Sequence, residues 1–422
     1  MCSHICSVVP PYLLQSIAEA SHNPQHVREA AQNTLLVQKN LLDTRKSRSL
    51  SRSNYNLGHG EHQSIVPEQL LEHIANSSAV DDLTRANARR DLQHIRDTIA
   101  HYQLSQQDFI DQQTSNQGFL GIGRARQQKA TGTFHRNVYD AGNGTKLPGT
   151  QVRAEGEQPV DDEAVNEAFD NVGTVLAMYR DKFNWMSIDN HNMVVNSSVH
   201  YGNHYQNAGW FPQQQQMVFG DGGELLWNFT KAVDVIGHEI THAVTEKTSP
   251  LAYLGQSGAL NEHVSDVFGI MAKQLSEGVT AEQADWLIGE ECLMPGTKGV
   301  ALRSMKNPGT AYDDPRLGKD PQPDNFQQYK ELDENTDHGG VHIYSGIPNR
   351  AFYLVATKFG GNSYEKAGQI WWNTMRSGRI PPLCKFLQFA DVTVEVAEEL
   401  FGSADSQIVR DAWNKVGVVR QI

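Results

Sequence analysis

The segment His238-Glu239-Ile240-Thr241-His242 has the pattern H-E-x-x-H and follows a helix-compatible stretch that begins at Ala232. At 3.6 residues per turn the two histidines share one helix face, so both imidazoles can reach a single metal ion while Glu239 lies beside its open side. The same pattern also fits an amphipathic helix with two partly exposed histidines and no metal. The surrounding sequence has to decide between these interpretations.

A third ligand is available twenty residues after the second histidine, where a helix-like stretch carries Glu262 and Asp266 four positions apart. These two carboxylates share a helix face. Catalytic zinc usually takes three protein ligands, and two histidines with one glutamate form a known set. His263 is the competing ligand, but it points about 100° away from Glu262. We predict zinc bound by His238, His242 and Glu262, with Asp266 orienting His238 through its other ring nitrogen.

Five sequence blocks in a fixed order resemble the thermolysin family of zinc endopeptidases. The resemblance runs from about residue 131 to the C-terminus and implies an α+β fold with two lobes. An N-terminal mixed-sheet lobe (130–255) and a mainly helical C-terminal lobe (256–422) are expected to meet at the active-site helix. The blocks are Asn207-Ala208-Gly209-Trp210 with Phe219-Gly220-Asp221-Gly222, the H-E-x-x-H segment, Ser257-Gly258-Ala259-Leu260-Asn261-Glu262, Leu302-Arg303-Ser304-Met305, and Gly339-Gly340-Val341-His342-Ile343-Tyr344-Ser345-Gly346.

The resemblance implies a mechanism of peptide hydrolysis. Zinc lowers the pKa of a bound water, and Glu239 accepts the water proton and passes it to the leaving amine. Tyr253 and His342 are expected to donate hydrogen bonds to the developing oxyanion, with Asp337 orienting His342.

The resemblance also implies how substrate is bound. Asn207 and Arg303 match positions that hydrogen-bond the peptide backbone around the cleaved bond, and the family cleaves on the amino side of bulky apolar residues. Two positions depart from the common pattern, because His338 stands where asparagine is frequent and Gly209 where an aromatic residue is frequent. We expect shifted subsite preferences.

Calcium is the main departure from the family pattern. Asp234, Asp285 and Glu290 match carboxylates of an internal calcium site, but Lys273 stands where a paired site needs a glutamate. Calcium takes 6 to 8 oxygen ligands, so an ammonium there would replace one ion. We expect at most one calcium ion, and the alternative is an Asp/Glu/Lys ion network without metal.

The chain opens with a segment that resembles the short propeptide of protealysin-type members of the family. The resemblance rests on Pro10-Pro11-Tyr12-Leu13-Leu14, which precede a helix-prone stretch at 15–42. We expect residues 1–50 to form a propeptide core that inhibits the enzyme intramolecularly, with a flexible linker at 44–60.

Residues 51–129 are interpreted as a helical extension and processing linker. Helical spacing of apolar residues over 65–110 predicts two helices, for which the resemblance supplies no counterpart. The stretch extends the pro-region or forms an accessory interaction module, and we favour the former. We expect self-cleavage within 118–130, where the sequence is Gly-rich and basic with apolar residues.

The cysteines show no C-x-x-C pattern and indicate no disulfide framework. Cys292 and Cys384 are far apart in the sequence. Cys2 or Cys6 could occupy the open zinc position of the precursor as a thiolate. The alternative, which we favour, is that the Pro-Pro stretch fills the cleft.

Charge and hydropathy exclude several partners. Residues 1–129 hold 13 Lys+Arg and 12 Asp+Glu, net +1, and residues 130–422 hold 23 and 37, net −14. This acidity argues against nucleic acid. No apolar run reaches the ~18 residues of a spanning helix, and the N-terminus lacks the pattern of a secretory signal. We expect a monomer that acts on proteins or peptides, cytoplasmic or exported without a signal peptide.

Two other functions compete with a self-processing zinc endopeptidase. A non-catalytic binding protein has no need for Glu239, Tyr253 and His342 together with the zinc ligands. A zinc aminopeptidase needs a carboxylate cluster for the free amine, which the aligned blocks lack. Enzymes with a third histidine ligand are excluded, because Thr245 and Thr248 stand at the required glycine and histidine positions.

Apolar spacing also predicts secondary structure outside the motifs. A helix is expected at 161–183 and a strand at 192–201. The C-terminal half is expected to be helical, with helices at 258–275, 347–359, 364–377, 386–400 and 406–416.

Overall fold

The computed structural model describes residues 6–50, 130, 132–333 and 336–419, with side chains for all of these except 6–7 and 39–50. The chain divides into two compact units, Met1–Gln38 with Lys129–Ile422, and Lys39–Gln128. The first unit carries the site and is described below. The predictions for 51–129 and for Cys2 lie outside the described residues.

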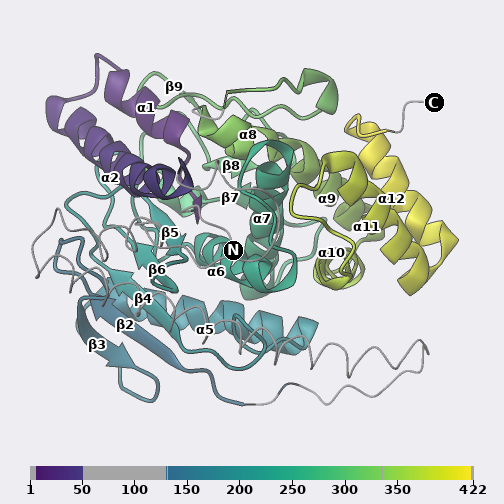
Figure 1. The fold of residues 1–422 in the computed structure, drawn as a ribbon, viewed down its shortest axis with the longest axis horizontal. Coiled ribbons are helices and arrows are strands. Elements are labelled where there is room, and N and C mark those ends of the chain that lie inside the picture. Colours follow the sequence, from purple (N-terminus) through teal and green to yellow (C-terminus); the bar gives the residue numbers. More distant parts are fainter. Residues whose placement is uncertain (1–5, 51–129, 131, 334–335, 420–422) are drawn as a thin grey trace, which may run out of the picture. The chain divides into compact units, whose positions relative to one another are not determined.

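A mixed sheet forms the N-terminal lobe (Figure 1). Its strand order is β1-β5-β6-β4-β2-β3, in which the β2–β4 and β4–β6 pairs are parallel and the other pairs are antiparallel. The strand expected at 192–201 is confirmed as β4. The bounds are β1 Cys6–Ser7, β2 Arg136–Asp140, β3 Thr150–Ala154, β4 Val195–Val199, β5 Ala208–Phe211 and β6 Gln216–Phe219.

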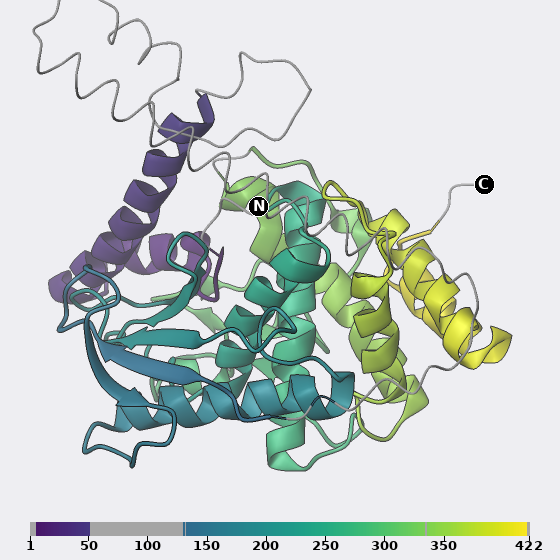
Figure 2. The same cartoon turned by 60° about the horizontal axis from the view of Figure 1, so that its bottom comes forward.

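Helix α5 (Glu163–Phe183) covers one face of this sheet, as Figures 1 and 2 show. Its N-cap is Asp162, whose carboxylate accepts from the Val165 N–H at 3.3 Å, and Asn184 ends it in the left-handed conformation. An apolar stripe that includes Val172 and Leu176 is buried. The predicted helix is confirmed, and its start is set by the Asp162 cap.

His200 ties the start of α5 to the loop after β6. Its Nε2 lies 2.8 Å from Asp162 Oδ2 and its Nδ1 lies 2.7 Å from Asp221 Oδ1. The two carboxylates outweigh the burial that opposes them and raise the pKa of His200 to about 9. At neutral pH an imidazolium therefore bridges the two carboxylates.

The His200 bridge predicts a pH-dependent stability. Because the folded pKa lies above the ordinary value of 6.5, the stabilisation is complete below that pH and is lost as pH rises through about 9. The partners are partly exposed, so we expect the unfolding free energy to fall by only about 1–2 kcal/mol over this window. Urea unfolding across the window should show this fall in wild type and in His191→Gln, whose histidine is exposed. A His200→Leu variant that kept the same fall would contradict the assignment.

Two helices bring the zinc-type motif into the core. These are α6 (Val233–Thr248) and α7 (Gly255–Glu277), and most of the residues of each are buried. They cross closely because a Cβ built on Gly237 would lie 2.9 Å from Gly269 Cα, and one on Gly269 would lie 2.5 Å from Asp234 O. Glycine at these two positions allows the backbones to approach, which brings the histidines of α6 next to Glu262 of α7.

The C-terminal lobe is helical, as expected. Its four terminal helices lie on the side of α6 and α7 away from the sheet (Figure 1). They bear out the helices expected from residue 347 onward, with ends shifted by at most three residues. The bounds are α8 Asp337–Tyr344, α9 Gly346–Phe359, α10 Lys366–Arg376, α11 Phe386–Phe401 and α12 Ser403–Lys415, with short pieces β7 Leu287–Ile288, η1 Glu290–Cys292, β8 Arg303–Ser304, β9 Asp313–Asp314, β10 Gly318–Lys319 and η2 Phe326–Gln328.

The expected propeptide core, residues 1–50, is called the pro-segment below. Its described part differs from the prediction in where the helix ends. The stretch 15–42 is helical, as expected, and is divided between two helices, because α1 (Pro11–Glu19) ends before Pro24 and α2 (Gln25–Leu50) begins after it. Pro11 occupies the first position of α1, where proline needs no N–H partner. The flexible linker expected from residue 44 is wrong for 44–50, which continue α2.

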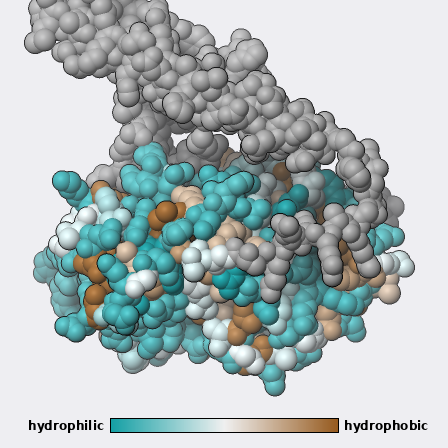
Figure 3. Space-filling view, turned by 90° about the horizontal axis from the view of Figure 1, so that it is seen from below, coloured by the Kyte–Doolittle hydropathy of each residue, from teal (hydrophilic) through white to brown (hydrophobic). Residues whose placement is uncertain are grey.

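One face of the described unit is mainly polar. The face in Figure 3 is largely hydrophilic, with small hydrophobic patches that are separated from one another. Scattered apolar residues of this kind are normal for a folded chain in water. Within the described ranges, no helix combines the length and the apolar character needed to cross a bilayer.

Candidate metal centre and active site

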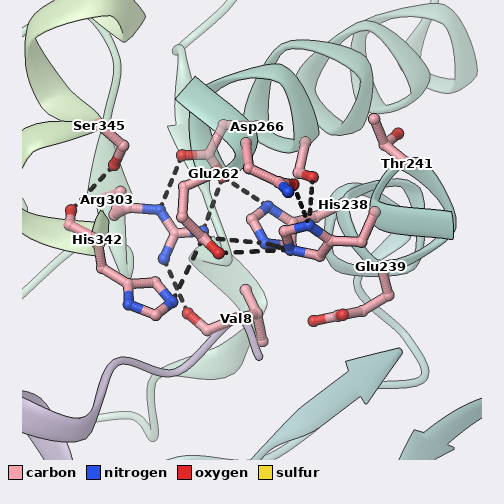
Figure 4. A network of polar contacts seen from close by, with 12 residues as sticks. Val8, His238, Glu239, Thr241, Glu262, Asp266, Arg303, His342 and Ser345 are labelled. Carbon is pink, nitrogen blue, oxygen red and sulfur yellow. Dashed lines mark hydrogen bonds and ion pairs between the residues drawn. The ribbon is translucent and has the colours of Figure 1, made fainter. Parts of the chain in front are cut away.

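Three predicted ligands meet at one point between α6 and α7, and Figure 4 labels two of them, His238 and Glu262. One donor atom each of His238, His242 and Glu262 can be chosen so that all lie within 4.8 Å of one another. The two Nε2 atoms are 3.0 Å apart, and Glu262 oxygens lie 3.3 Å from His238 Nε2 and 3.5 Å from His242 Nε2. All three side chains are buried.

The opposite ring nitrogens are held by a second layer of side chains. His238 Nδ1 lies 2.8 Å from Asp266 Oδ1, where the sequence analysis places this carboxylate. His242 Nδ1 lies 2.8 Å from Asn261 Oδ1 and 3.0 Å from Ser265 Oγ. Sequence reasoning missed the role of Asn261, because no periodicity distinguishes it from other polar residues of α7. These contacts aim both Nε2 atoms at Glu262.

The donor set fits a divalent zinc ion. Two imidazole nitrogens and a carboxylate match a catalytic zinc set, and Glu262 Oε2 is buried with no hydrogen-bond partner in the described part of the chain. Burial lowers the pKa of His242 to about 3, so its ring is neutral. Burial also acts to lower the pKa of His238. The carboxylates of Glu262 and Asp266 outweigh burial and raise the pKa of His238 to about 10. A metal ion would replace that proton.

Glu239 is a buried carboxylate beside these ligands. Its Oε2 accepts a hydrogen bond from the Trp210 N–H of β5 at 2.9 Å, a contact that the sequence analysis did not foresee. Its Oε1 is buried without a hydrogen-bond partner among the described residues. Burial raises the pKa of Glu239 to about 7, against the opposing effect of His238. Such a carboxyl can both take up and release a proton near neutral pH.

The predicted oxyanion donors lie on the other side of Glu262. The Tyr253 hydroxyl donates to Glu262 Oε1 and lies 3.3 Å from His342 Nε2. His342 Nδ1 is 2.6 Å from Asp337 Oδ1, and the His342 N–H donates to Asp337 Oδ2 at 2.9 Å. The pKa of His342 is raised, because Glu262 and Asp337 outweigh burial.

The backbone between Asp337 and His342 follows a path that the sequence analysis did not predict, and this path brings the two residues into contact. His338, Gly339 and Gly340 have φ values of 51°, 79° and 85° and break the helical path inside α8. This turn brings the N–H groups of His342 and Ile343 to Asp337. Glycine adopts these angles without steric cost.

Arg303 is fully buried, and it binds a side-chain carboxylate as well as a backbone carbonyl. Its Nε and Nη2 donate to Asp266 at 2.9 and 2.7 Å, and its Nη1 donates to the Val8 carbonyl at 2.8 Å. Asn349 Nδ2 donates to the same carboxylate at 2.8 Å. Sequence reasoning missed the Arg303–Asp266 pair and Asn349, which come from separate parts of the chain. The arginine therefore links the pro-segment to the residue that orients His238.

Asn207 holds the pro-segment through its backbone. Its Oδ1 accepts from the Val9 N–H at 2.8 Å, and its Nδ2 donates to the Val9 carbonyl at 2.9 Å. Just before this point β1 pairs with β5, with Ser7 opposite Gly209. The pro-segment thus crosses the site, and Val8 and Val9 are buried in it. The residues that contact Asn207 and Arg303 are Val8 and Val9, which directly precede Pro10 and Pro11.

His263 takes no part in the metal cluster. Its Nδ1 lies 2.8 Å from Asn349 Oδ1, and its Nε2 accepts from Trp371 Nε1 at 2.7 Å. Both ring nitrogens are thus used within the core. His338 lies instead at the edge of the site, with its ring 5.5 Å from the Tyr253 ring.

The residues matched to a calcium site form an ion network around Lys273. Its ammonium lies 2.9 Å from Asp285 Oδ2, 3.1 Å from Glu290 Oε2 and 3.3 Å from the Leu287 carbonyl. Asp234 receives backbone N–H groups from Val235 and Gly289. Burial alone would lower the pKa of Lys273, but the carboxylates raise it above its ordinary range. Lys273 thus makes the contacts with carboxylates that an Asp/Glu/Lys ion network predicts.

The two-lobed fold and this site define a metal-dependent peptide hydrolase. Residues 96–246 match the model of the thermolysin metallopeptidase catalytic domain, and residues 249–418 match that of its alpha-helical domain. Protease PrtS of Photorhabdus sp. (strain Az29) is 41% identical over 358 residues, covering 85% of this chain and 92% of the relative. The chain belongs to the thermolysin family of metallopeptidases. It is a zinc-dependent endopeptidase with a propeptide, as the sequence analysis expected.

Two further similarities concern the precursor. The precursor of protealysin, a metalloproteinase from Serratia proteamaculans, matches with a TM-score of 0.73 and 39% identity, covering 98% of this chain and all of that chain. An extracellular metalloprotease of Pectobacterium carotovorum subsp. carotovorum is 42% identical over 85% of this chain and 97% of the relative. Residues 63–107 match the protealysin propeptide model, so the expectation that this stretch lacks a counterpart is wrong. The match favours an extended pro-region over an accessory module.

Proposed function

We propose that His238, His242 and Glu262 hold the zinc ion and that Glu239 is the proton carrier of peptide hydrolysis. The observation that carries this assignment is the convergence of three buried donor groups beside a buried carboxylate. Both histidines are oriented by partners at their other nitrogen, so their Nε2 atoms are available to a metal.

Glu239 acts as base and then as acid. A zinc ion held at this site supplies Lewis acidity that lowers the pKa of a water and polarises the scissile carbonyl. Glu239 takes the proton of the attacking water and passes it to the leaving nitrogen. Its raised pKa suits both steps, because a proton carrier works best with a pKa near the working pH.

Tyr253 and His342 stabilise the oxyanion. Both lie next to Glu262, so a carbonyl oxygen near the metal comes within reach of the hydroxyl and of the protonated imidazole. Asp337 orients His342 through Nδ1 and favours its charged form. Asp266 performs the same orienting function for His238.

Asn207 and Arg303 bind the backbone of the substrate. In the precursor they hold Val8 and Val9 through carbonyl and N–H groups, which every peptide offers. The two valines are fully buried there. This environment supports cleavage on the amino side of bulky apolar residues.

The test combines metal content with cleavage of a blocked peptide. We expect one zinc per chain in wild type, and hydrolysis of an acetylated and amidated peptide by the processed enzyme. A His242→Gln variant should lose zinc, and the matched His263→Gln variant should keep it, because His263 lies outside the cluster. Zinc retained by His242→Gln would contradict the ligand set, and failure on blocked peptides would favour an aminopeptidase.

Self-processing within 118–130 is also proposed, and only residue 130 of this window lies in the described part. The precursor should lose its N-terminal part in the presence of zinc, and Glu239→Ala should not. Intact mass would show the new N-terminus, and an end outside 118–130 would contradict the window. The thiol role of Cys2 or Cys6, the monomeric state and the export route stay predictions.

We propose that Lys273 replaces calcium in the acidic cluster, which predicts calcium-independent stability. Thermal unfolding of wild type should be unchanged by EGTA or millimolar calcium. Lys273→Met should cost about 1–3 kcal/mol, because Asp285 and Glu290 lose their shared cation, whereas the exposed Lys247→Met should cost under about 0.5 kcal/mol. A calcium-dependent rise of the melting temperature in wild type would refute the replacement.

A further inference from the structure

We propose that the pro-segment lies in the cleft as a substrate, with Ser7–Val8 as the bond presented for hydrolysis. Cleavage of this bond is then the first step in processing of the precursor, ahead of any cut near residues 118–130. The proposal rests on the catalytic roles assigned above.

The register is set on the C-terminal side of the bond by three backbone groups. The Val8 carbonyl accepts from Arg303 Nη1 at 2.8 Å, and the Val9 N–H and carbonyl pair with the two ends of the Asn207 amide at 2.8 and 2.9 Å. Backbone contacts of this kind fix which residue stands where, independently of the side chains. Val8 and Val9 therefore occupy the first two positions after the bond.

The chain before the bond is held by strand pairing. Ser7 pairs antiparallel with Gly209 and Cys6 with Trp210, at the edge of the sheet. Both sides of the Ser7–Val8 bond are thus bound, by β5 on one side and by Asn207 and Arg303 on the other. The bond itself lies at the junction of these two sets of contacts.

This junction faces the catalytic residues. Figure 4 shows Val8 between His342 on one side and Glu239 on the other. The backbone N–H of Val8 is close enough to the Glu239 carboxylate to be among the groups that lower its pKa. That nitrogen is the atom that must receive a proton when the Ser7–Val8 bond breaks, so the proton carrier and the leaving group are near each other before the reaction.

The reaction is a hydrolysis with water as the only co-reactant. The water oxygen bonds to the Ser7 carbonyl carbon, and the bond from this carbon to the Val8 nitrogen breaks. One water proton passes through Glu239 to that nitrogen. The products are a carboxylate at Ser7 and a free amino group at Val8.

The cut should not release the active site. Val8, Leu13, Leu14 and Ile17 are fully buried, and Asn23 Nδ2 and Thr34 Oγ1 hydrogen-bond Arg316 O and the Gln206 N–H at 3.2 and 3.0 Å. These contacts lie after the cut and remain. A precursor that begins at Val8 therefore stays inhibited until the rest of the pro-segment leaves, so this step produces no activity of its own.

The test follows the N-terminus of the zinc-loaded full chain by intact mass. We expect loss of residues 1–7 and a new N-terminus at Val8, with a rate that does not depend on protein concentration, since the bond is bound intramolecularly. Val8→Leu should still be cut, whereas Val8→Pro should not, because it removes the N–H that faces Glu239. Glu239→Gln should keep residues 1–7.

A second readout needs neither zinc nor catalysis. Hydrogen exchange of the metal-free precursor should show a protected Val9 amide, and Asn207→Leu should reduce that protection by about tenfold, because it removes the hydrogen-bond acceptor. Unprotected Val9 in wild type would overturn the register. A wild-type precursor that keeps residues 1–7, while its processed form hydrolyses a blocked peptide, would overturn the cleavage and leave the proposed function intact. If the precursor kept residues 1–7 and its processed form did not hydrolyse the blocked peptide, both this cleavage and the proposed function would be wrong.

Discussion

Replacing Glu239 with glutamine should lower kcat/KM for a blocked peptide by about 10²–10⁴-fold while leaving one zinc per chain. The amide keeps the size of the carboxylate and can accept from the Trp210 N–H through its oxygen, so the fold is retained. It cannot take a proton from water or deliver one to the leaving nitrogen. The expected result is a folded, metal-loaded protein that is catalytically impaired.

The measurement pairs steady-state kinetics of the processed enzyme with metal analysis. The processed form of the variant has to be prepared with an added protease, because its own processing should fail. Glu157→Gln is a matched control, since Glu157 is an exposed carboxylate on the surface. If Glu239→Gln keeps activity within about tenfold of wild type, another residue carries the proton and the assignment is wrong.

Local sequence predicted those parts of the site that depend on helix geometry. His238 and His242 share a face because they are one turn apart, and Glu262 and Asp266 share a face of α7 for the same reason. Apolar spacing likewise located α5 and the helices of the C-terminal lobe. In each case the residues that determine the feature lie within a few positions of it in the chain.

The contacts that sequence reasoning missed depend on residues that are far apart in the chain. The Trp210 N–H that supports Glu239 and the Asn349 amide that supports Asp266 belong to other elements, and neither residue has a pattern that marks it. The pairing of Ser7 with Gly209 joins a short terminal strand to a sheet edge. A strand of this length has no detectable alternation, so its partner could not be predicted.

Lys273 bears on an alternative that the sequence left open. Its position among acidic residues allowed either one calcium ion or an ion network. The structure places its ammonium on Asp285 and Glu290, where a cation is needed. The charge is thereby balanced by the chain itself, which supports the network.

Replacing Arg303 with methionine should destabilise the precursor by about 3–5 kcal/mol, the cost of leaving a buried carboxylate without its partner. Asp266 would keep only His238 and Asn349, and the pKa of this carboxyl, now held low by Arg303, would rise. Urea unfolding of the full chain measures the loss. Arg379→Met removes a partly exposed pair with Glu399 and should cost under about 1 kcal/mol.

Arg303 has two contacts, and the experiment can separate them. The Asp266 pair supports the metal centre, whereas the bond to the Val8 carbonyl holds the pro-segment. Arg303→Met should therefore weaken zinc binding as well as stability, because His238 loses a rigid partner. The processed enzyme lacks the pro-segment but keeps the Asp266 pair, so its zinc affinity should equal that of the precursor. If Arg303→Met bound zinc like wild type and unfolded at the same urea concentration, the Arg303–Asp266 pair would not support the site, and the arginine would serve peptide binding alone.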